Sequence, residues 1–543
     1  MRARPVAISA PTLLMVAACS SLLGLQPPRE QSDGGGGGGD GGGSADFSLT
    51  VTNPAPRVPS NGFDFLDISI ARDSGDVSDV TVTLATPPAG VTAKTLVIPA
   101  GTSTGELEVD GAMSLKPGTT VMLDVSATSG AFTHDAMITA AVTIPPGALD
   151  PSFGSGGIAS SGPTQRGRTL IDVSVGSDGT ITAVGTENSE LAGEVGLVVQ
   201  FTGSGAPDLT FGAGNGETTV NARNSAIAAF VQGMSRHQPQ LYLAGQGAST
   251  GGQDDGWVCR LTGSGAIDAG YGSASGANGV VHDIGHPNSI ALAVTNTVDG
   301  VIALIEDASN NAYIYRTLEN GHDDFSNLEP LAVPILVDGG HAAMVVDQKA
   351  ATLPIYIVGD TVDRKSIAVA RVTETGTLDP GFGGGSAGSG IAAIPKMADE
   401  STVAVAPIAN GVLIAGTVSG TYFVRKLHAD GSVDTTFGTN GIVSARVTAA
   451  GAAAAVDMVV QADGKILVAG NGAADSSAPG PILARYTADG AIDVTYGMHG
   501  VAAFALGNGV TIGGVDLQPD GKAVVAGGLQ DSNGASVLAR VGF

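Results

Sequence analysis

The sequence predicts an all-β protein, in which a small immunoglobulin-like β-sandwich precedes a seven-bladed β-propeller. Three observations predict this fold class. Of the 543 residues, 43% are hydrophobic and 14% are charged, which is too apolar for a disordered chain. Short runs alternate apolar and polar residues, as half-buried strands do. A short motif also recurs at an interval of about 60 residues, which is typical of a repeat protein.

Residues 1–18 have the layout of a secretory signal, with two early arginines and a short apolar stretch. That stretch is too short for a spanning helix, which needs about 20 residues. The small residues before Cys19 resemble the lipobox of bacterial lipoprotein signals. The resemblance implies cleavage before Cys19, lipid on its thiol and anchoring in a membrane. By the sorting rules of that family, Ser20 implies the outer membrane. The alternative is an ordinary signal that contains a cysteine.

Residues 19–46 are predicted to form a flexible tether, because nine glycines around Asp40 cannot build a core. The chain has two cysteines, and a lipidated Cys19 cannot form a disulfide with Cys259. We therefore expect the exported domains to fold without disulfides. Cys259 lies in a strand-like apolar run and is expected to be a buried, unreactive thiol.

Residues 47–144 contain about seven alternating runs, separated by proline- and glycine-rich breaks. This spacing predicts an antiparallel sandwich of the immunoglobulin-like kind. We interpret the sandwich as a spacer between the tether and the repeat domain. The alternative is a ligand-binding module.

From Leu149 onward the chain repeats a motif of aspartate, two spacer residues, an aromatic residue and glycine. The motif occurs at Asp150–Gly154, Asp208–Gly212, Asp268–Gly272, Asp379–Gly383, Asp434–Gly438 and Asp493–Gly497. The long interval between Asp268 and Asp379 fits two units, with a degenerate copy at Asp324 and Phe325. That makes seven units between residues 149 and 543.

Each unit has room for about four strands, and the Asp463-Gly464 pair is a hairpin signal. Seven units of four strands each predict a seven-bladed propeller, in which neighbouring sheets bury each other's faces. We expect the repeated aromatic residues to pack between blades. The repeated aspartates are expected to form turns by accepting backbone N–H groups.

The two ends of the repeat predict how the ring closes. The chain begins its repeat with the turn at Leu149 and stops at Phe543, where another such turn would begin. We therefore predict that Gly157–Ser161 is the outer strand of the last blade and pairs with Val537–Val541. The alternative is seven self-contained blades.

The repeats resemble the delta-60 family of bacterial secreted propellers over about residues 149–543. The resemblance rests on Leu149–Gly157, Asp463–Gly470 and Leu483–Gly490, which match that family's pattern closely. Units three and four depart from it most. The family carries no settled activity, so the resemblance implies a fold and not a function.

Because units three and four depart from the repeat, their polar residues are the candidates for a private function. The candidate ligand-contact residues are His282, His286, His322, Asp323 and Asp324. The alternative is sequence drift without function. His282 and His286 are not favoured as a zinc-binding pair. Residues four apart lie on one face of a helix, whereas a strand or loop is expected here.

The sequence predicts no catalytic residue, resident metal or other cofactor. Gly384–Gly388 matches a Gly-x-Ser-x-Gly pattern, but that motif needs a strand-to-helix elbow. The sequence lacks a calcium-binding loop of alternating aspartates that ends in glutamate. The only calcium binding expected is adventitious, at acidic clusters such as Asp254-Asp255.

The net charge of −26 would repel a phosphate backbone, so we expect no nucleic-acid partner. The predicted function is that of a non-enzymatic, lipid-anchored envelope protein, a monomer displayed on a stalk for binding or adhesion. Its expected partners are the membrane, through the lipid on Cys19, and a protein or polysaccharide. The alternatives are a carbohydrate-active or other hydrolytic enzyme, which needs two opposed carboxylates at the propeller channel, and a purely structural envelope component.

Overall fold

The computed structural model describes residues 46–542 except 61, 74–77, 113, 162–166, 190–192, 221–228, 238–239, 249–253, 273–278, 283–287, 297–299, 319–330, 338–342, 351, 384–388, 449–452, 473–479, 508 and 529–534. Every regular element within these ranges is a β-strand. The described residues contain no helix of the length and apolarity needed to cross a membrane.

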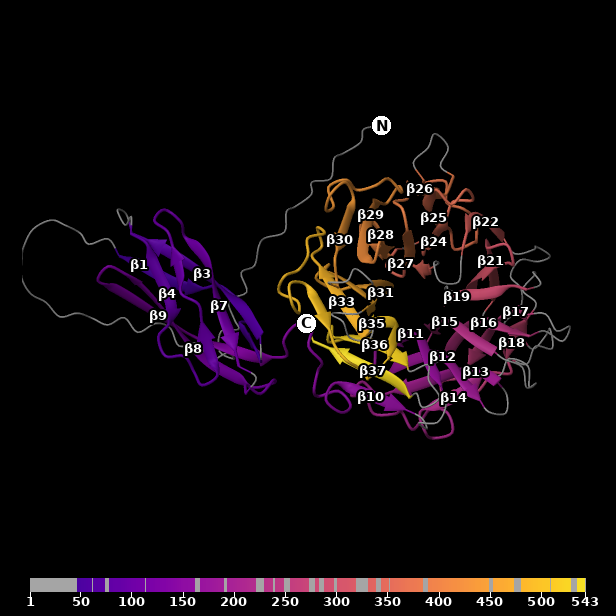
Figure 1. Ribbon diagram of the computed structural model, residues 1–543, viewed down its shortest axis with the longest axis horizontal. Helices are drawn as coiled ribbons and strands as arrows, with labels where there is room; N and C mark the ends of the chain where they lie inside the picture. Colours follow the sequence, from indigo (N-terminus) through magenta and orange to yellow (C-terminus); the bar gives the residue numbers. More distant parts are fainter. Residues whose placement is uncertain are drawn as a thin grey trace, which may run out of the picture.

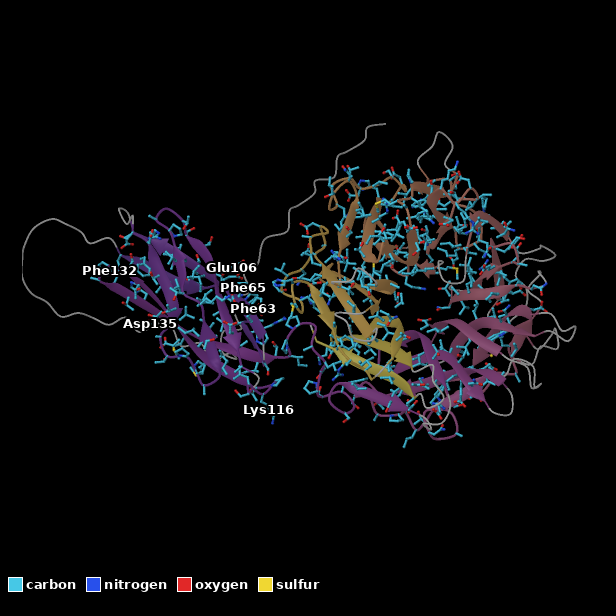
Figure 2. The ribbon with its side chains drawn as sticks, in the orientation of Figure 1. Phe63, Phe65, Glu106, Lys116, Phe132 and Asp135 are labelled. Carbon is cyan, nitrogen blue, oxygen red and sulfur yellow. The ribbon has the colours of Figure 1, made fainter. Side chains whose placement is uncertain are left out.

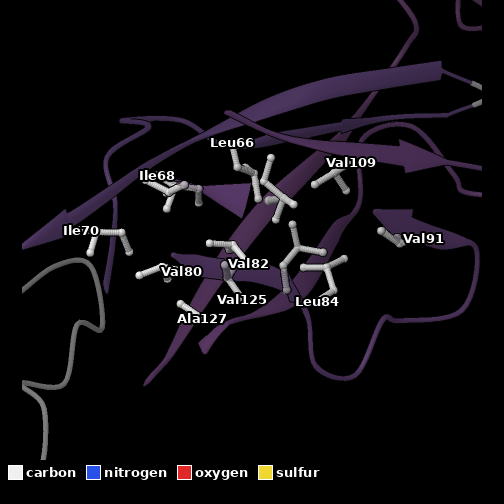
Figure 3. Packing of buried hydrophobic residues seen from close by; sticks show 14 of the residues in the cluster. Leu66, Ile68, Ile70, Val80, Val82, Leu84, Val91, Val109, Val125 and Ala127 are labelled. Atoms are coloured by element: carbon white, nitrogen blue, oxygen red, sulfur yellow. The ribbon is translucent and has the colours of Figure 1, made fainter. Parts of the chain in front are cut away.

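Two sheets form the N-terminal domain and share one core. The first consists of β1 (Phe47–Val51), β3 (Gly62–Arg72), β7 (Thr104–Gly111) and β5 (Val91–Ala93), in that order. The second consists of β2 (Arg57–Pro59), β9 (Phe132–Thr143), β8 (Thr120–Ser129), β4 (Val80–Leu84) and β6 (Leu96–Ile98). Strand β4 alternates buried and half-buried residues, as its sequence predicts. Leucine, isoleucine and valine side chains from both sheets meet between them (Figure 3).

The remaining strands form sheets of four, or of eight where two units join. One four-stranded sheet consists of β11 (Arg168–Val175), β12 (Ile181–Ser189), β13 (Gly193–Phe201) and β14 (Glu217–Val220), and the next of β15 (Ala229–His237), β16 (Gln240–Ala248), β17 (Asp254–Leu261) and β18 (Val280–His282). Two more consist of β27 (Glu400–Ile408), β28 (Gly411–Val418), β29 (Thr421–His428) and β30 (Ile442–Ala445), and of β31 (Ala453–Val460), β32 (Ile466–Gly472), β33 (Gly480–Tyr486) and β34 (Val501–Ala503). The last has the strand order β10 (Ile158–Ser161), β37 (Ser536–Val541), β36 (Ala523–Gly528) and β35 (Thr511–Leu517).

The eight-stranded sheet contains β19 (Ile290–Asn296), β20 (Gly300–Glu306), β21 (Asn311–Leu318), β22 (Leu331–Leu336), β23 (Ala343–Val346), β24 (Ile355–Asp360), β25 (Ser366–Val372) and β26 (Ile391–Pro395). Only the pair Leu336–Asp360 joins β22 to β24. The sheet is therefore two four-stranded units that touch at one edge.

The sheets stand around a common centre, as in a β-propeller (Figure 1). The first strand of each unit lies nearest the middle, and each such strand contacts the next, from β11 through β35 and back to β11. Antiparallel strands place the Asp-Gly hairpins and the aspartate–aromatic turns on one face, which we call the repeat face. The connections that lead into the first strand of each unit lie on the opposite face, which we call the loop face.

The two ends of the repeat share one sheet, which confirms the predicted closure. Strand β10 pairs antiparallel with β37, with Ser160 opposite Val537 and Ala159 opposite Leu538. Strand β37 therefore lies between β10 from the start of the repeat and β36 from its end. Residues almost 380 positions apart in the sequence are thus neighbours in one sheet.

The repeated motif forms the same turn in all six intact copies, which confirms the predicted role of its aspartate. In the last copy, the Asp493 carboxylate accepts the Thr495 N–H at 3.1 Å. The equivalent bonds go from Ser152 to Asp150, Thr210 to Asp208, Gly270 to Asp268, Gly381 to Asp379 and Thr436 to Asp434. The aromatic residue of each turn is at most 1% exposed and packs against the neighbouring sheet, as predicted.

In four of the six copies, a turn glycine of the neighbouring unit lies against the aromatic ring. Gly265 has φ +83°, and a Cβ at that position would lie 2.8 Å from the Phe211 ring. We expect Gly265→Ala to lower the free energy of unfolding by about 2–3 kcal/mol, the sum of left-handed strain and a clash. Gly179→Ala is the matched control, because Gly179 has φ +82° and its nearest atom is 4.0 Å away. Equal losses in chemical denaturation would mean that the aromatic contact contributes nothing.

The link from the sandwich completes the last turn of the repeat. In four other units, a turn from threonine to glycine precedes the aspartate, as where the Thr202 N–H donates to the Ala206 carbonyl, and His428 replaces the threonine in a fifth. In the last unit this turn is divided between two chain segments: Gly542 N–H donates to Ala148, and Gly147 N–H donates to Gly542. The link that leaves the sandwich is thus hydrogen-bonded into the propeller beside Gly542.

Candidate functional site

Three repeated sequence elements converge on one ion-pair cluster on the repeat face. Asp493 receives Arg485 Nε at 2.8 Å and Lys465 Nζ at 3.3 Å, and the Arg485 guanidinium lies 4.4 Å from the centre of the Tyr496 ring. Equivalent pairs are Arg540 with Asp150, Arg260 with Asp268, Arg371 with Asp379 and Lys426 with Asp434. A cluster that recurs in every intact unit except at Asp208 supports the scaffold and is not a candidate active site.

Two aspartates on the innermost strands link one unit to the next. The Asp457 carboxylate accepts the Val515 N–H at 3.0 Å, and the Asp516 carboxylate accepts the Val175 N–H at 2.7 Å. Burial raises the pKa of Asp457 to about 7 and that of Asp516 to about 6, although these backbone N–H groups oppose the shift. The two carboxylates bind inner strands together across units, so their protonation is coupled to the stability of the ring.

A raised pKa in the folded state makes stability fall as pH rises. The stabilising protonation of Asp457 and Asp516 is complete below about pH 4 and is lost as pH passes through about 6–7. We therefore expect the free energy of unfolding to fall by roughly 1–3 kcal/mol between pH 5 and pH 8. Urea denaturation at both pH values measures the change. Asp457→Asn is expected to flatten the profile, whereas the exposed control Asp463→Asn retains it; equal slopes in both variants would contradict the assignment.

The loop face carries a charged pocket of about 340 Å³ between the fourth and fifth four-stranded units. It is lined by Leu336, Val337, Asp360, Arg364, Lys396, Asp399, Glu400 and Ser401. Lys396 Nζ lies 2.5 Å from Asp360 Oδ1, and both side chains are less than a fifth exposed. Arg364 and Asp399 have φ values of 56° and 59°, so two loops reach the pocket through left-handed residues.

Below the pocket, Glu400 is held by a buried arginine. Arg425 donates Nε to Glu400 Oε1 at 2.7 Å and Nη2 to Oε2 at 3.0 Å. The Met397 N–H also donates to Glu400 at 2.8 Å. These three hydrogen bonds hold the loop Lys396–Asp399 against the pocket. Arg425 occupies a strand position at which neighbouring units have small residues, such as Ala370 and Ala484.

The structure describes one of the five predicted ligand-contact residues. His282 ends strand β18, where it is opposite Trp257. His286, His322, Asp323 and Asp324 lie outside the described residues, as do Cys19 and the Gly384–Gly388 pattern. The strand before His286 ends on the loop face and the strand before His322 ends on the repeat face. The ligand-contact role of these residues stays a prediction.

Cys259 is a buried free thiol in β17, as predicted. Burial, with a smaller contribution from the Asp268 charge, raises its pKa to about 12. A thiol of that pKa remains protonated at neutral pH and is a poor nucleophile. In the described part of the chain, no three His, Cys, Asp or Glu side chains come close enough together to hold a metal ion.

Sequence reasoning missed the pocket residues, because they come from three separated segments. Asp360 and Arg364 flank the connection after β24, whereas Lys396, Asp399 and Glu400 lead into β27. One feature of the sequence indicates the pocket. Basic residues are scarce, at 25 against 51 acids, yet Arg364 and Lys396 both fall in connections that do not follow the repeat.

Residues 409–437 and 461–496 match a protein family described as a domain of unknown function (DUF5122) β-propeller. The matched residues lie in the units formed by β27–β30 and β31–β34 and support a β-propeller repeat protein. No curated protein matches the chain.

Solved structures give weaker likenesses. One chain from a structural and mechanistic analysis of two prolyl endopeptidases matches with a TM-score of 0.35 and 9% identity, over 84% of this chain and 54% of that one. A GH43_1 enzyme from Xanthomonas citri complexed with xylotriose matches with a TM-score of 0.24 and 12% identity, over 57% of this chain and 92% of that one. A hypothetical protein from Leishmania major matches with a TM-score of 0.23 and 11% identity, over 45% of this chain and 80% of that one.

Proposed function

We propose that this protein is a non-enzymatic binding module of the bacterial cell envelope, with its ligand site at the charged pocket between Asp360 and Glu400. In this proposal the described sheets make seven blades, the N-terminal domain is immunoglobulin-like, and lipid on Cys19 anchors the chain in the outer membrane. The delta-60 resemblance and the lipobox resemblance support these finer assignments.

The observation that carries the proposal is the pairing of the pocket's charges. Asp360 is paired with Lys396 and Glu400 with Arg425, so two of its three carboxylates are already neutralised by cations. A glycosidase needs one carboxyl group that donates a proton and a second that acts as base or nucleophile. A pocket lined by paired acids and bases suits hydrogen bonding to a polar polymer better than it suits proton transfer.

The position of the pocket also supports binding. Repeated residues form the scaffold cluster on the repeat face, whereas the pocket lies on the loop face among residues that do not repeat. Connections on a rigid scaffold are the usual carriers of specificity. The tether predicted for residues 19–46 would hold this face away from the membrane.

A pull-down from envelope extract tests the proposal, with the soluble fragment from Asp46 onward as bait. We expect one polysaccharide or protein to be retained. Lys396→Ala is expected to reduce its retention about tenfold, because the pocket loses a mostly buried cation that can form charge-assisted hydrogen bonds with the ligand. The control is Lys349→Ala, an exposed lysine in the neighbouring hairpin of the same unit on the opposite face. Equal retention by both variants would remove the pocket from the ligand site.

The hydrolase alternative predicts a different result. Glu400→Gln would abolish release of reducing ends from an envelope polysaccharide if Glu400 were catalytic. We expect the unsubstituted protein to release none, as judged by a reducing-sugar assay. Release that disappears in Glu400→Gln would replace the binding proposal by the enzyme.

A further inference from the structure

A second cavity lies where the sandwich meets the propeller, well apart from the charged pocket. It has a volume of about 1150 Å³ and is bordered by the sandwich, its exit link and the outer strands β30 and β34. Its lining includes Phe63, Arg446, Thr448, Val494, Met498 and His499. We call this cavity the junction cleft.

The junction cleft exists because the sandwich link replaces a turn of the repeat. In an ordinary unit, the turn glycine donates to the next unit, as Gly438 N–H does to the Asp489 carbonyl. At the corresponding place, Gly497 N–H donates to Pro146 at 2.9 Å. The sandwich is thereby placed beside the turn Asp493–Gly500, and Phe63 lies on the side of the sandwich nearest the propeller (Figure 2). Its ring meets Phe65 edge-on at 5.7 Å.

The turn beside the cleft carries larger and less polar side chains than the equivalent turn of another unit. Positions occupied by Ser155 and Gly156 in one unit hold Met498 and His499 here. His499 has φ +55°, a left-handed conformation that costs a non-glycine residue free energy. Met498 is 78% exposed, which is unusual for so large an apolar side chain. The departure adds a flexible apolar side chain and an imidazole to the cleft.

The charges of the cleft oppose those of the whole chain. The protein carries 51 acidic and 25 basic residues, but the cleft lining contains Arg446 and His499 and not one aspartate or glutamate. Next to Arg446, the Thr448 residue is 4% exposed and its Oγ1 has no hydrogen-bond partner in the described part of the chain. A buried orphan hydroxyl costs free energy unless something bound in the cleft accepts its proton or donates to it.

We infer that the junction cleft binds a single-chain amphiphile with an anionic head, namely a long-chain fatty acid. The alkyl chain lies against Phe63, Val494 and Met498, where each methylene removed from water strengthens binding. The carboxylate lies against the Arg446 guanidinium, whose Nε also donates to the Thr448 carbonyl at 3.2 Å, and a charge-assisted hydrogen bond holds it there. The Thr448 hydroxyl then gains a hydrogen-bond partner in the headgroup. The inference does not depend on the ligand of the charged pocket.

Calorimetric titration of the full chain carrying Cys19→Ser with palmitate tests the inference. We expect one palmitate per chain with a Kd of about 1 μM or tighter. Met498→Asp is expected to weaken binding at least about tenfold, because it places a carboxylate in an apolar, cation-lined cleft. The matched control is Leu209→Asp on a sister turn, where Leu209 is 67% exposed and outside the cleft.

Two further probes make the inference falsifiable. Hexadecyltrimethylammonium has the same alkyl length with a cationic head, and we expect it to bind at least about tenfold more weakly than palmitate. Thr448→Val is expected to weaken palmitate binding by a few-fold while leaving the melting temperature unchanged or higher. Equal binding of both amphiphiles would overturn the headgroup assignment. Binding to phosphatidylglycerol vesicles without binding of monomeric palmitate would overturn the cleft as its site.

Discussion

Leu538→Asp is expected to unfold the propeller. Leu538 is fully buried in β37, opposite Ala159 of β10 and Ala526 of β36. A carboxylate there would lie in the apolar cluster that holds Phe153 and Leu197, at a cost above about 4 kcal/mol. Because β37 is shared by both ends of the repeat, the loss reaches the whole ring. Circular dichroism during heating is expected to show no cooperative transition for the propeller.

The control for this substitution is Leu209→Asp, the same chemical change at a leucine that is 67% exposed. Its melting temperature is expected to stay within about 2 °C of the unsubstituted protein. A Leu538→Asp variant that melts as cooperatively as this control would show that β37 does not hold the ends of the repeat together.

Arg485→Ala is expected to lower the free energy of unfolding by about 3–5 kcal/mol. Arg485 and Asp493 are 3% and 5% exposed, and removing one partner of a buried ion pair leaves the other charge without compensation. Burial itself raises the pKa of Asp493, but the Thr495 hydroxyl and the Arg485 and Lys465 charges lower it more, so its pKa stays below the usual range. Lys465 remains in the variant and keeps the loss from being larger.

The chain supplies the control for this prediction. Lys426 pairs with Asp434 at 3.0 Å in the position that Arg485 occupies in the next unit. We therefore expect Arg485→Lys to lose less than half as much as Arg485→Ala in urea denaturation. If the lysine and alanine variants lose the same amount, the cost comes from packing against Tyr496 and not from the ion pair.

The repeat made much of the scaffold predictable. A turn that recurs with its aspartate and aromatic residue shows where each unit begins. The repeat starts with such a turn at Leu149 and stops at Phe543 where the next turn would begin, and this offset predicts the closing strand. The pairing of arginine with aspartate also left a signal, because Arg260, Arg371 and Arg485 each precede the paired aspartate by eight residues. A constant interval between opposite charges predicts a contact.

The pocket and the junction cleft could not be predicted in the same way. The Glu400–Arg425 pair joins residues 25 positions apart, and no second unit repeats it among the residues that the structure describes. Arg446 and Phe63 line the same cleft only because the link from the sandwich replaces a repeat turn, which depends on tertiary packing between domains. Periodicity reports what neighbouring units share, so features that occur once give no periodic signal.

The central claim is that the first and last repeat strands pair and so close a ring of seven blades. A disulfide between Ser160→Cys and Val537→Cys, in a chain without Cys19 and Cys259, tests it most directly. The two residues are opposite each other in β10 and β37, within the distance that a disulfide requires. Mass spectrometry after mild oxidation is expected to find this link within monomers and to find none for the control pair Ser160→Cys and Ser444→Cys. Thiols at 160 and 537 that stay reduced, or that link only between chains, would contradict the closed ring.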